Sequence, residues 1–130
     1  MTIPWSAAEL HRLGAAVELQ IAVRRADGTL RDRTPIWVVC ADGQVYVRTW
    51  HARDTGWFGQ ALRSRRARIR VPGLEADVIV ENIGEGAVEL RESVDTAYKL
   101  KYGAGSASMV SPSAVVTTLR LDHEPDPQVA

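Results

Sequence analysis

Alternation of apolar and polar residues marks most of the first half of the chain. From Val17 to Val23 every second residue is apolar, which is typical of a half-buried strand. Residues 34–40 form a more continuous apolar run and predict a second strand, buried on both faces. An Asp-Gly turn at 42–43 leads into a third predicted strand over residues 44–49. The pattern therefore indicates strands connected by hairpins.

The second half of the chain adds three predicted strands. Residues 67–71 alternate arginine with apolar residues, and the alternation resumes in residues 76–80 after a Pro-Gly turn, which predicts another hairpin. Residues 115–121 form the sixth predicted strand.

Helical spacing appears at three places. Ser6 and Glu9 have the spacing of a capping box and predict a short helix over residues 7–13. Apolar residues three and four apart in residues 57–62 predict a second helix. Residues 88–102 give the longest helical pattern, and a glycine follows it.

Six short strands with helices at the start, middle and end predict an α+β fold, a small six-stranded antiparallel barrel decorated by helices. A chain of 130 residues is the size of one domain, which we place at residues 1–123. The polar, proline-broken residues 124–130 predict a frayed tail.

Composition narrows the expected partners. No apolar run approaches the roughly 20 residues of a bilayer span, so no membrane contact is expected. The 16 basic and 16 acidic side chains cancel, which disfavours nucleic acid. The amino terminus lacks the pattern of a signal peptide and the chain has a single cysteine, so a cytoplasmic location is expected. The three histidines lie far apart, and no metal site is expected.

Residues 63–70 carry five arginines. Arg63 and Arg66 fall at a predicted helix end, whereas Arg68 and Arg70 fall in a strand, so a single nucleic-acid-binding face is disfavoured. Recognition of phosphate or carboxylate by one or two of these guanidinium groups remains open. Solvent exposure and salt bridges across a dimer remain open as well.

Residues 47–58 read VRTWHARDTGWF, at a predicted strand end and helix start. Backbone N–H groups are free at such a place and the helix dipole favours an anion, which Arg48 and Arg53 would help to bind. Trp50 and Trp57 suit a pocket wall as well as a dimer interface. His51 is a candidate general acid or base, with a hydrogen-bonding surface role as the alternative.

The run from Arg33 to Arg70 resembles the core of the flavin-binding split barrels, in particular the deazaflavin-dependent nitroreductase-like branch. An RTPIWVV strand, an Asp-Gly turn, another strand, an aromatic-bearing helix and a hairpin strand occur there in the same order. Together with AYKLKYG at 97–103 and SPSAVVTTLRL at 111–121, nearly the whole chain is similar to an uncharacterised bacterial family, a domain of unknown function. The resemblance implies a split β-barrel and a homodimer that binds a flavin or deazaflavin cofactor at the subunit interface.

From these patterns and the resemblance we assign cofactor binding to Arg33, Thr34, Arg48, Thr49, Arg53 and Trp57, substrate contact to Trp37 and Trp50, and catalysis to His51. A structural place for Trp37 in the core remains open.

Two functions stay open: a flavin- or deazaflavin-dependent oxidoreductase, and a cofactor-free cyclase, isomerase or binding protein for a hydrophobic metabolite. The second draws support from Ala52, where the family usually has glycine, since the extra side chain occupies space.

Overall fold

The computed structural model of the chain describes residues 2–49 and 56–125. Seven strands occur within them: β1 (Leu19–Val23), β2 (Thr34–Ile36), β3 (Val39–Ala41), β4 (Gln44–Val47), β5 (Arg66–Val71), β6 (Leu74–Asn82) and β7 (Leu119–His123). The helices are α1 (Ala7–Ala15), α2 (Gly56–Ser64), α3 (Val88–Tyr102), the 3-10 helix η1 (Gly103–Met109) and α4 (Pro112–Val115).

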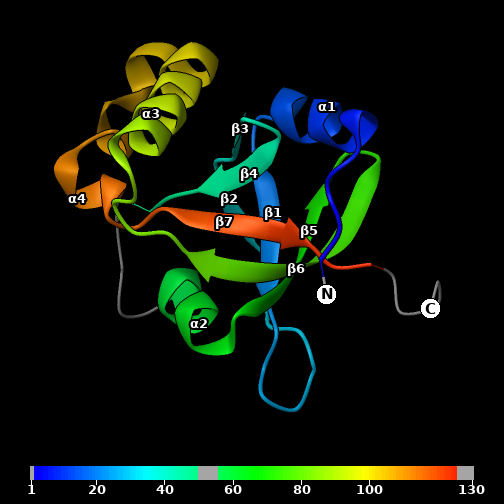
Figure 1. Ribbon diagram of the computed structural model, residues 1–130. Coiled ribbons are helices and arrows are strands. Elements are labelled where there is room, and N and C mark those ends of the chain that lie inside the picture. The colour runs from blue at the N-terminus through cyan, green and yellow to red at the C-terminus, as the bar shows by residue number, and fades with distance from the viewer. Residues whose placement is uncertain (1, 50–55, 126–130) are drawn as a thin grey trace.

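The strands form one antiparallel sheet that curls into a split barrel (Figure 1). Their order is β2-β1-β5-β6-β7-β4-β3, so β2 and β3 are the two edges. Only Trp37 and Val38 separate these edges along the chain, and three residue steps span at most about 10 Å. The sheet must therefore curl until its edges come close together. We call Trp37 and Val38 the seam.

The predicted α+β antiparallel barrel is confirmed, but the single predicted strand over residues 34–40 is wrong, and the sheet has seven strands instead of six. Side chains from the end of α3 bind the backbone at the seam. The Val38 amide donates to the Tyr102 hydroxyl at 3.2 Å, and Lys101 Nζ donates to the Val38 carbonyl at 2.6 Å. Because these groups supply its hydrogen bonds, the chain can leave one edge and join the other.

Alternating residues of the strands fill the barrel interior. On β5 and β6 the buried positions are Ala67, Ile69, Val71, Ala76, Val78 and Val80, as the alternation predicts. Phe58 and Ala61 of α2 and Leu13 of α1 pack against the same interior. A second cluster beneath α3 consists of Val39, Tyr46, Val94, Tyr98 and Met109. Strand β4 is therefore covered on both faces.

The capping box of α1 is present, with the Glu9 amide 3.1 Å from Ser6 Oγ and the Ser6 amide 2.8 Å from Glu9 Oε1. The helix continues past the predicted end at Leu13 to Ala15. The predicted bounds of α3 are confirmed.

The strand predicted over residues 115–121 begins only at Leu119. The hydroxyls of Thr117 and Thr118 bond back to the α4 carbonyls of Ala114 (2.6 Å) and Val115 (2.7 Å), which keeps this segment in a turn.

Trp5, near the amino terminus, is buried at 6% exposure. Its indole Nε1 donates to the Leu121 carbonyl at 3.0 Å, and its ring stacks on His123 with 4.3 Å between centroids. The two ends of the described chain thus lie close together (Figure 1). Most of the predicted frayed tail lies outside the described residues. Among the described helices, none has the length and apolar character needed to cross a membrane.

Candidate functional site

A cleft of about 380 Å³ lies where the seam, the end of β4 and the start of α2 approach one another. We call it the Trp37 cleft. Its lining residues are Glu18, Pro35, Ile36, Trp37, Arg48, Thr49, Gly56, Trp57, Ser108 and Met109. The volume is in the range of pockets that hold small organic ligands.

The cleft brings together four of the residues that the sequence singles out: Trp37, Arg48, Thr49 and Trp57. Thr34 lies one residue before the lining, in β2, where it pairs with Ile21 in the ladder. Arg33 is exposed and approaches Glu75 at 4.0 Å, away from the lining. Trp50, His51 and Arg53 belong to the segment between Thr49 and Gly56, which is outside the described residues.

The indole of Trp37 is held in place by α3. It stacks on Tyr102 with 4.0 Å between ring centroids and 2° between the ring planes. The Tyr102 hydroxyl in turn donates to the Val17 carbonyl at 2.6 Å. A ring fixed in this way can contact a planar ligand without losing further conformational freedom.

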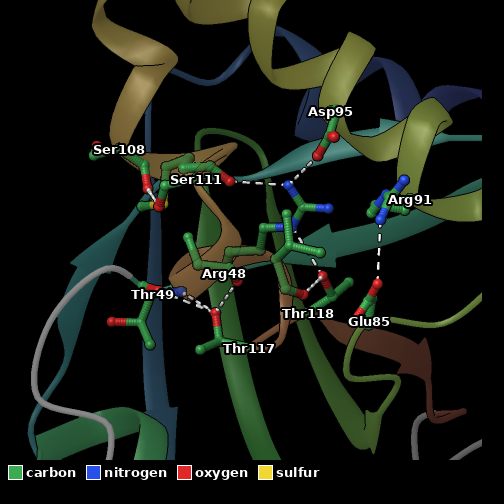
Figure 2. A network of polar contacts seen from close by, with 12 residues as sticks. Arg48, Thr49, Glu85, Arg91, Asp95, Ser108, Ser111, Thr117 and Thr118 are labelled. Carbon is green, nitrogen blue, oxygen red and sulfur yellow. Dashed lines mark hydrogen bonds and ion pairs between the residues drawn. The ribbon is translucent and has the colours of Figure 1, made fainter.

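Arg48 is fully buried and connects β4 to α3 and η1 (Figure 2). Its Nη1 donates to Asp95 Oδ1 at 2.6 Å and to the Met109 carbonyl at 2.9 Å, and its Nε donates to Thr118 Oγ1 at 2.8 Å. The guanidinium carbon lies 5.5 Å from the centre of the Tyr98 ring, within cation–π range. Nη2 has no hydrogen-bond partner among the described residues.

The carboxylate of Asp95 therefore balances the Arg48 charge inside the protein. Arg48 is predicted from the sequence to bind a cofactor, but three of its hydrogen bonds are directed to the protein itself. Arg48 therefore stabilises the wall of the cleft by connecting β4 to α3 and η1.

Thr49 is fixed by the turn before β7 (Figure 2). Its amide donates to Thr117 Oγ1 at 3.0 Å, and the Thr117 hydroxyl shares its proton between the Thr49 carbonyl at 3.0 Å and the Ala114 carbonyl at 2.6 Å. Arg48 and Thr49 are thus both held by hydrogen bonds to the hydroxyls of one turn, at Thr117 and Thr118.

Ser108 and Met109 line the cleft from η1, a segment in which the sequence patterns indicate no site residue. The small residues of η1 are the sequence feature that could have indicated a close approach of its backbone to the cleft. At Gly105 an added Cβ would lie 3.6 Å from Cη2 of Trp37, so the η1 backbone comes close to the indole.

A larger, more open depression of about 810 Å³ lies along β3, between the end of α1 and α3. No residue assigned to the site from the sequence lines it. Burial raises the pKa of the Cys40 thiol there and lowers the pKa of Lys101, whose ammonium group is already bound at the seam. In residues 2–49 and 56–125 no three His, Cys, Asp or Glu side chains are grouped to hold a metal ion. The Trp37 cleft is the stronger candidate site.

A curled antiparallel sheet with its cleft beside the seam defines an α+β split-barrel protein. Residues 9–121 match the family described as uncharacterised protein conserved in bacteria, DUF2255. The chain belongs to that family.

Solved structures support the fold. A candidate 5-nitroimidazole antibiotic resistance protein from Bacteroides thetaiotaomicron superposes with a TM-score of 0.64 at 15% identity, covering 96% of this chain and 84% of that chain. An FAD-binding protein from Mesorhizobium loti gives 0.56 at 12% identity, with 97% and 94% covered. An F420 reductase gives 0.52 at 12% identity, with 95% and 96% covered. No protein with a curated description matches the chain.

Proposed function

We propose that the protein binds a flavin or deazaflavin ring in the Trp37 cleft and is a cytoplasmic oxidoreductase. The observation that carries the proposal is the position of the cleft: two tryptophans and two hydroxyl-bearing residues line it beside the seam of a split barrel. The names of two structural neighbours, an FAD-binding protein and an F420 reductase, point to the same class of ligand.

The lining fits a planar ring with polar edges. Trp37 and Trp57 offer aromatic surface, and the hydroxyls of Thr49 and Ser108 offer hydrogen bonds. A bound flavin or deazaflavin would supply hydride chemistry. The chain would supply the orientation of the ring, with Trp37 already fixed by Tyr102. Arg53 stays a proposed phosphate ligand, and His51 a proposed proton donor or acceptor.

The alternative function is a cofactor-free cyclase, isomerase or binding protein for a hydrophobic metabolite. One observation favours it: Arg48 is the only cationic residue among the described residues that line the cleft, and its charge is paired with Asp95. The described part of the cleft therefore offers surface for a ring and no unpaired cation for a phosphate.

We also propose that the protein is a homodimer, as the resemblance to split barrels implies. Leu100 on α3 is 83% exposed and Val17 is 73% exposed, and burying such side chains against a second copy would be favourable.

Titration calorimetry and absorption spectra with FMN, FAD and F420 test the function. We expect saturable binding of at least one of them, with a shifted visible spectrum, and about a tenfold loss of affinity in Trp37→Leu because a stacking surface is removed. Val88→Ala, which removes an exposed apolar side chain outside both the cleft and the proposed dimer surface, is the control and should bind as the wild type does. If none of the three compounds binds, the cofactor-free alternative takes precedence.

A further inference from the structure

Another pocket, of about 400 Å³, lies at the carboxyl end of α2. It is lined by Arg24, Arg25, Ala26, Gly28, Arg31, Gln60, Arg63, Ser64 and Arg66. We call it the arginine pocket, because five of these residues are arginines and none of the described lining residues is acidic. We propose that it is a binding site for a small anion that carries two or more phosphate groups. The proposal is independent of the function proposed for the Trp37 cleft.

The fold assembles this pocket from three separate segments. Arg24, Arg25 and Arg31 come from the hairpin after β1, which lies beside α2 and the start of β5 in Figure 1. The Arg24 amide donates to the Arg66 carbonyl at 2.9 Å, which fixes the hairpin against β5. Arg63 reaches the pocket from the last turn of α2.

The arginine run of residues 63–70 is divided by the fold. Arg68 and Arg70 lie outside the pocket, where both pair with Glu75 of the neighbouring strand at 3.1 and 3.5 Å. Arg63 and Arg66 join the hairpin arginines instead. The pocket is therefore a cluster that the spacing of the arginines along the chain does not reveal.

Acidic side chains balance only part of the charge in the pocket. Arg24 pairs with Asp77 at 2.8 Å, and Arg66 pairs with Glu124 at 2.5 Å. Arg25 forms no ion pair with any described residue, and the side chains of Arg31 and Arg63 form neither an ion pair nor a hydrogen bond within the described chain. Arg31 and Arg63 thus have no acidic partner among the described residues, and Arg25 has only the exposed carboxylate of Asp27 near it, outside the lining. A multiply charged anion would relieve the repulsion among these three positive charges.

The hairpin holds two of the guanidinium groups ready for a ligand. Arg24 Nη1 donates to the Gly28 carbonyl at 2.8 Å, and Arg25 Nη1 donates to the Leu30 carbonyl at 2.9 Å. The remaining N–H groups of the pocket have the planar fork that matches phosphate oxygens. The nearby carboxylate of Asp27 does not line the pocket and accepts hydrogen bonds from Thr29 at 2.6 and 3.0 Å.

Calorimetry with inorganic tripolyphosphate, pyrophosphate and orthophosphate tests the proposal. We expect saturable binding to the wild type that weakens as sodium chloride is added, and tighter binding of tripolyphosphate than of orthophosphate. In the double variant Arg31→Gln/Arg63→Gln the affinity for tripolyphosphate should fall at least about tenfold, because each lost contact is a charge-assisted hydrogen bond. Neither side chain has a described partner, so circular dichroism and the melting temperature should stay unchanged.

The matched control is Arg70→Gln/Arg91→Gln, which removes the same charge from arginines that pair with Glu75 and Glu85 outside the pocket. It should bind tripolyphosphate within about twofold of the wild type. The proposal is overturned if the wild type does not bind, if both double variants weaken equally, or if orthophosphate binds as tightly as tripolyphosphate. A change of oligomeric mass in Arg31→Gln/Arg63→Gln with unchanged tripolyphosphate binding would also overturn it, since the arginines would then contact a second copy. Flavin titration of the same variants keeps this test separate from that of the Trp37 cleft.

Discussion

Replacement of Asp95 by Ala tests how much the hydrogen bonds and the ion pair of Arg48 contribute to the free energy of unfolding. The Arg48 side chain is 0% exposed, and Asp95 is the carboxylate that balances its charge, at 2.6 Å. In Asp95→Ala the guanidinium would stay buried, with the Met109 carbonyl, the Thr118 hydroxyl and the Tyr98 ring as its remaining contacts.

Removing one partner of a buried ion pair costs about 3–5 kcal/mol. The Asp95 side chain is 21% exposed, so water can enter where the carboxylate was, and the lower end of that range applies. We expect a loss of about 3 kcal/mol in the free energy of unfolding. For a domain of this size the melting temperature should fall by roughly 10 °C.

Urea unfolding followed by circular dichroism at pH 7 measures the free energy, and a thermal scan measures the melting temperature. Glu92→Ala removes an exposed acidic residue from the same helix and should change stability by less than about 0.5 kcal/mol. Replacing both partners, as in Arg48→Met/Asp95→Leu, should recover much of the loss because no unpaired charge remains. If Asp95→Ala unfolds within about 0.5 kcal/mol of the wild type, the inferred dependence of Arg48 on Asp95 is refuted.

Three further outcomes are expected. Burial alone would raise the pKa of Asp77, but hydrogen bonds from Arg24 and Arg68 outweigh it and lower the pKa below the ordinary 3.8. Its stabilising contribution is therefore present above about pH 4 and lost as pH falls through the folded value, so in urea unfolding the deficit of Asp77→Asn should shrink toward pH 2. In Tyr102→Phe the Val38 amide loses its hydroxyl acceptor while an aromatic ring remains beside Trp37, and about 1–3 kcal/mol of stability should be lost in the same assay. Light scattering at micromolar concentration should give the mass of a dimer, and a monomeric mass would contradict the proposed assembly.

Much of the fold follows from local patterns in the sequence. The capping box predicts the start of α1, and the alternation predicts the buried faces of β5 and β6. The two edges of the barrel do not follow, because an apolar run such as residues 34–40 looks the same whether it pairs with one strand or passes between two. The division at Trp37 and Val38 depends on Tyr102 and Lys101, more than 60 residues further along the chain.

The sequence singles out several residues that line one cleft, but it does not give the role of each residue. Trp37, Thr49 and Trp57 line one cleft. Thr49 and Trp57 flank the predicted strand end and helix start, whereas Trp37 belongs to the apolar run of residues 34–40. The sequence cannot show that Arg48 is paired, because Asp95 lies on a helix 47 residues away. The arginine pocket shows the same limit, since its hairpin and helix arginines come together only in the folded chain.

The Trp37 cleft is lined in part by a residue that closes the barrel. Trp37 is at once a wall of the cleft and one of the two residues that join the sheet edges, and Tyr102 of α3 stacks on it. Any ligand that binds only the folded form adds its binding free energy to the stability of that form. A ligand in the cleft would contact Trp37 itself, which connects the two sheet edges. An occupied cleft would therefore stabilise the closed barrel and the packing of α3 against it.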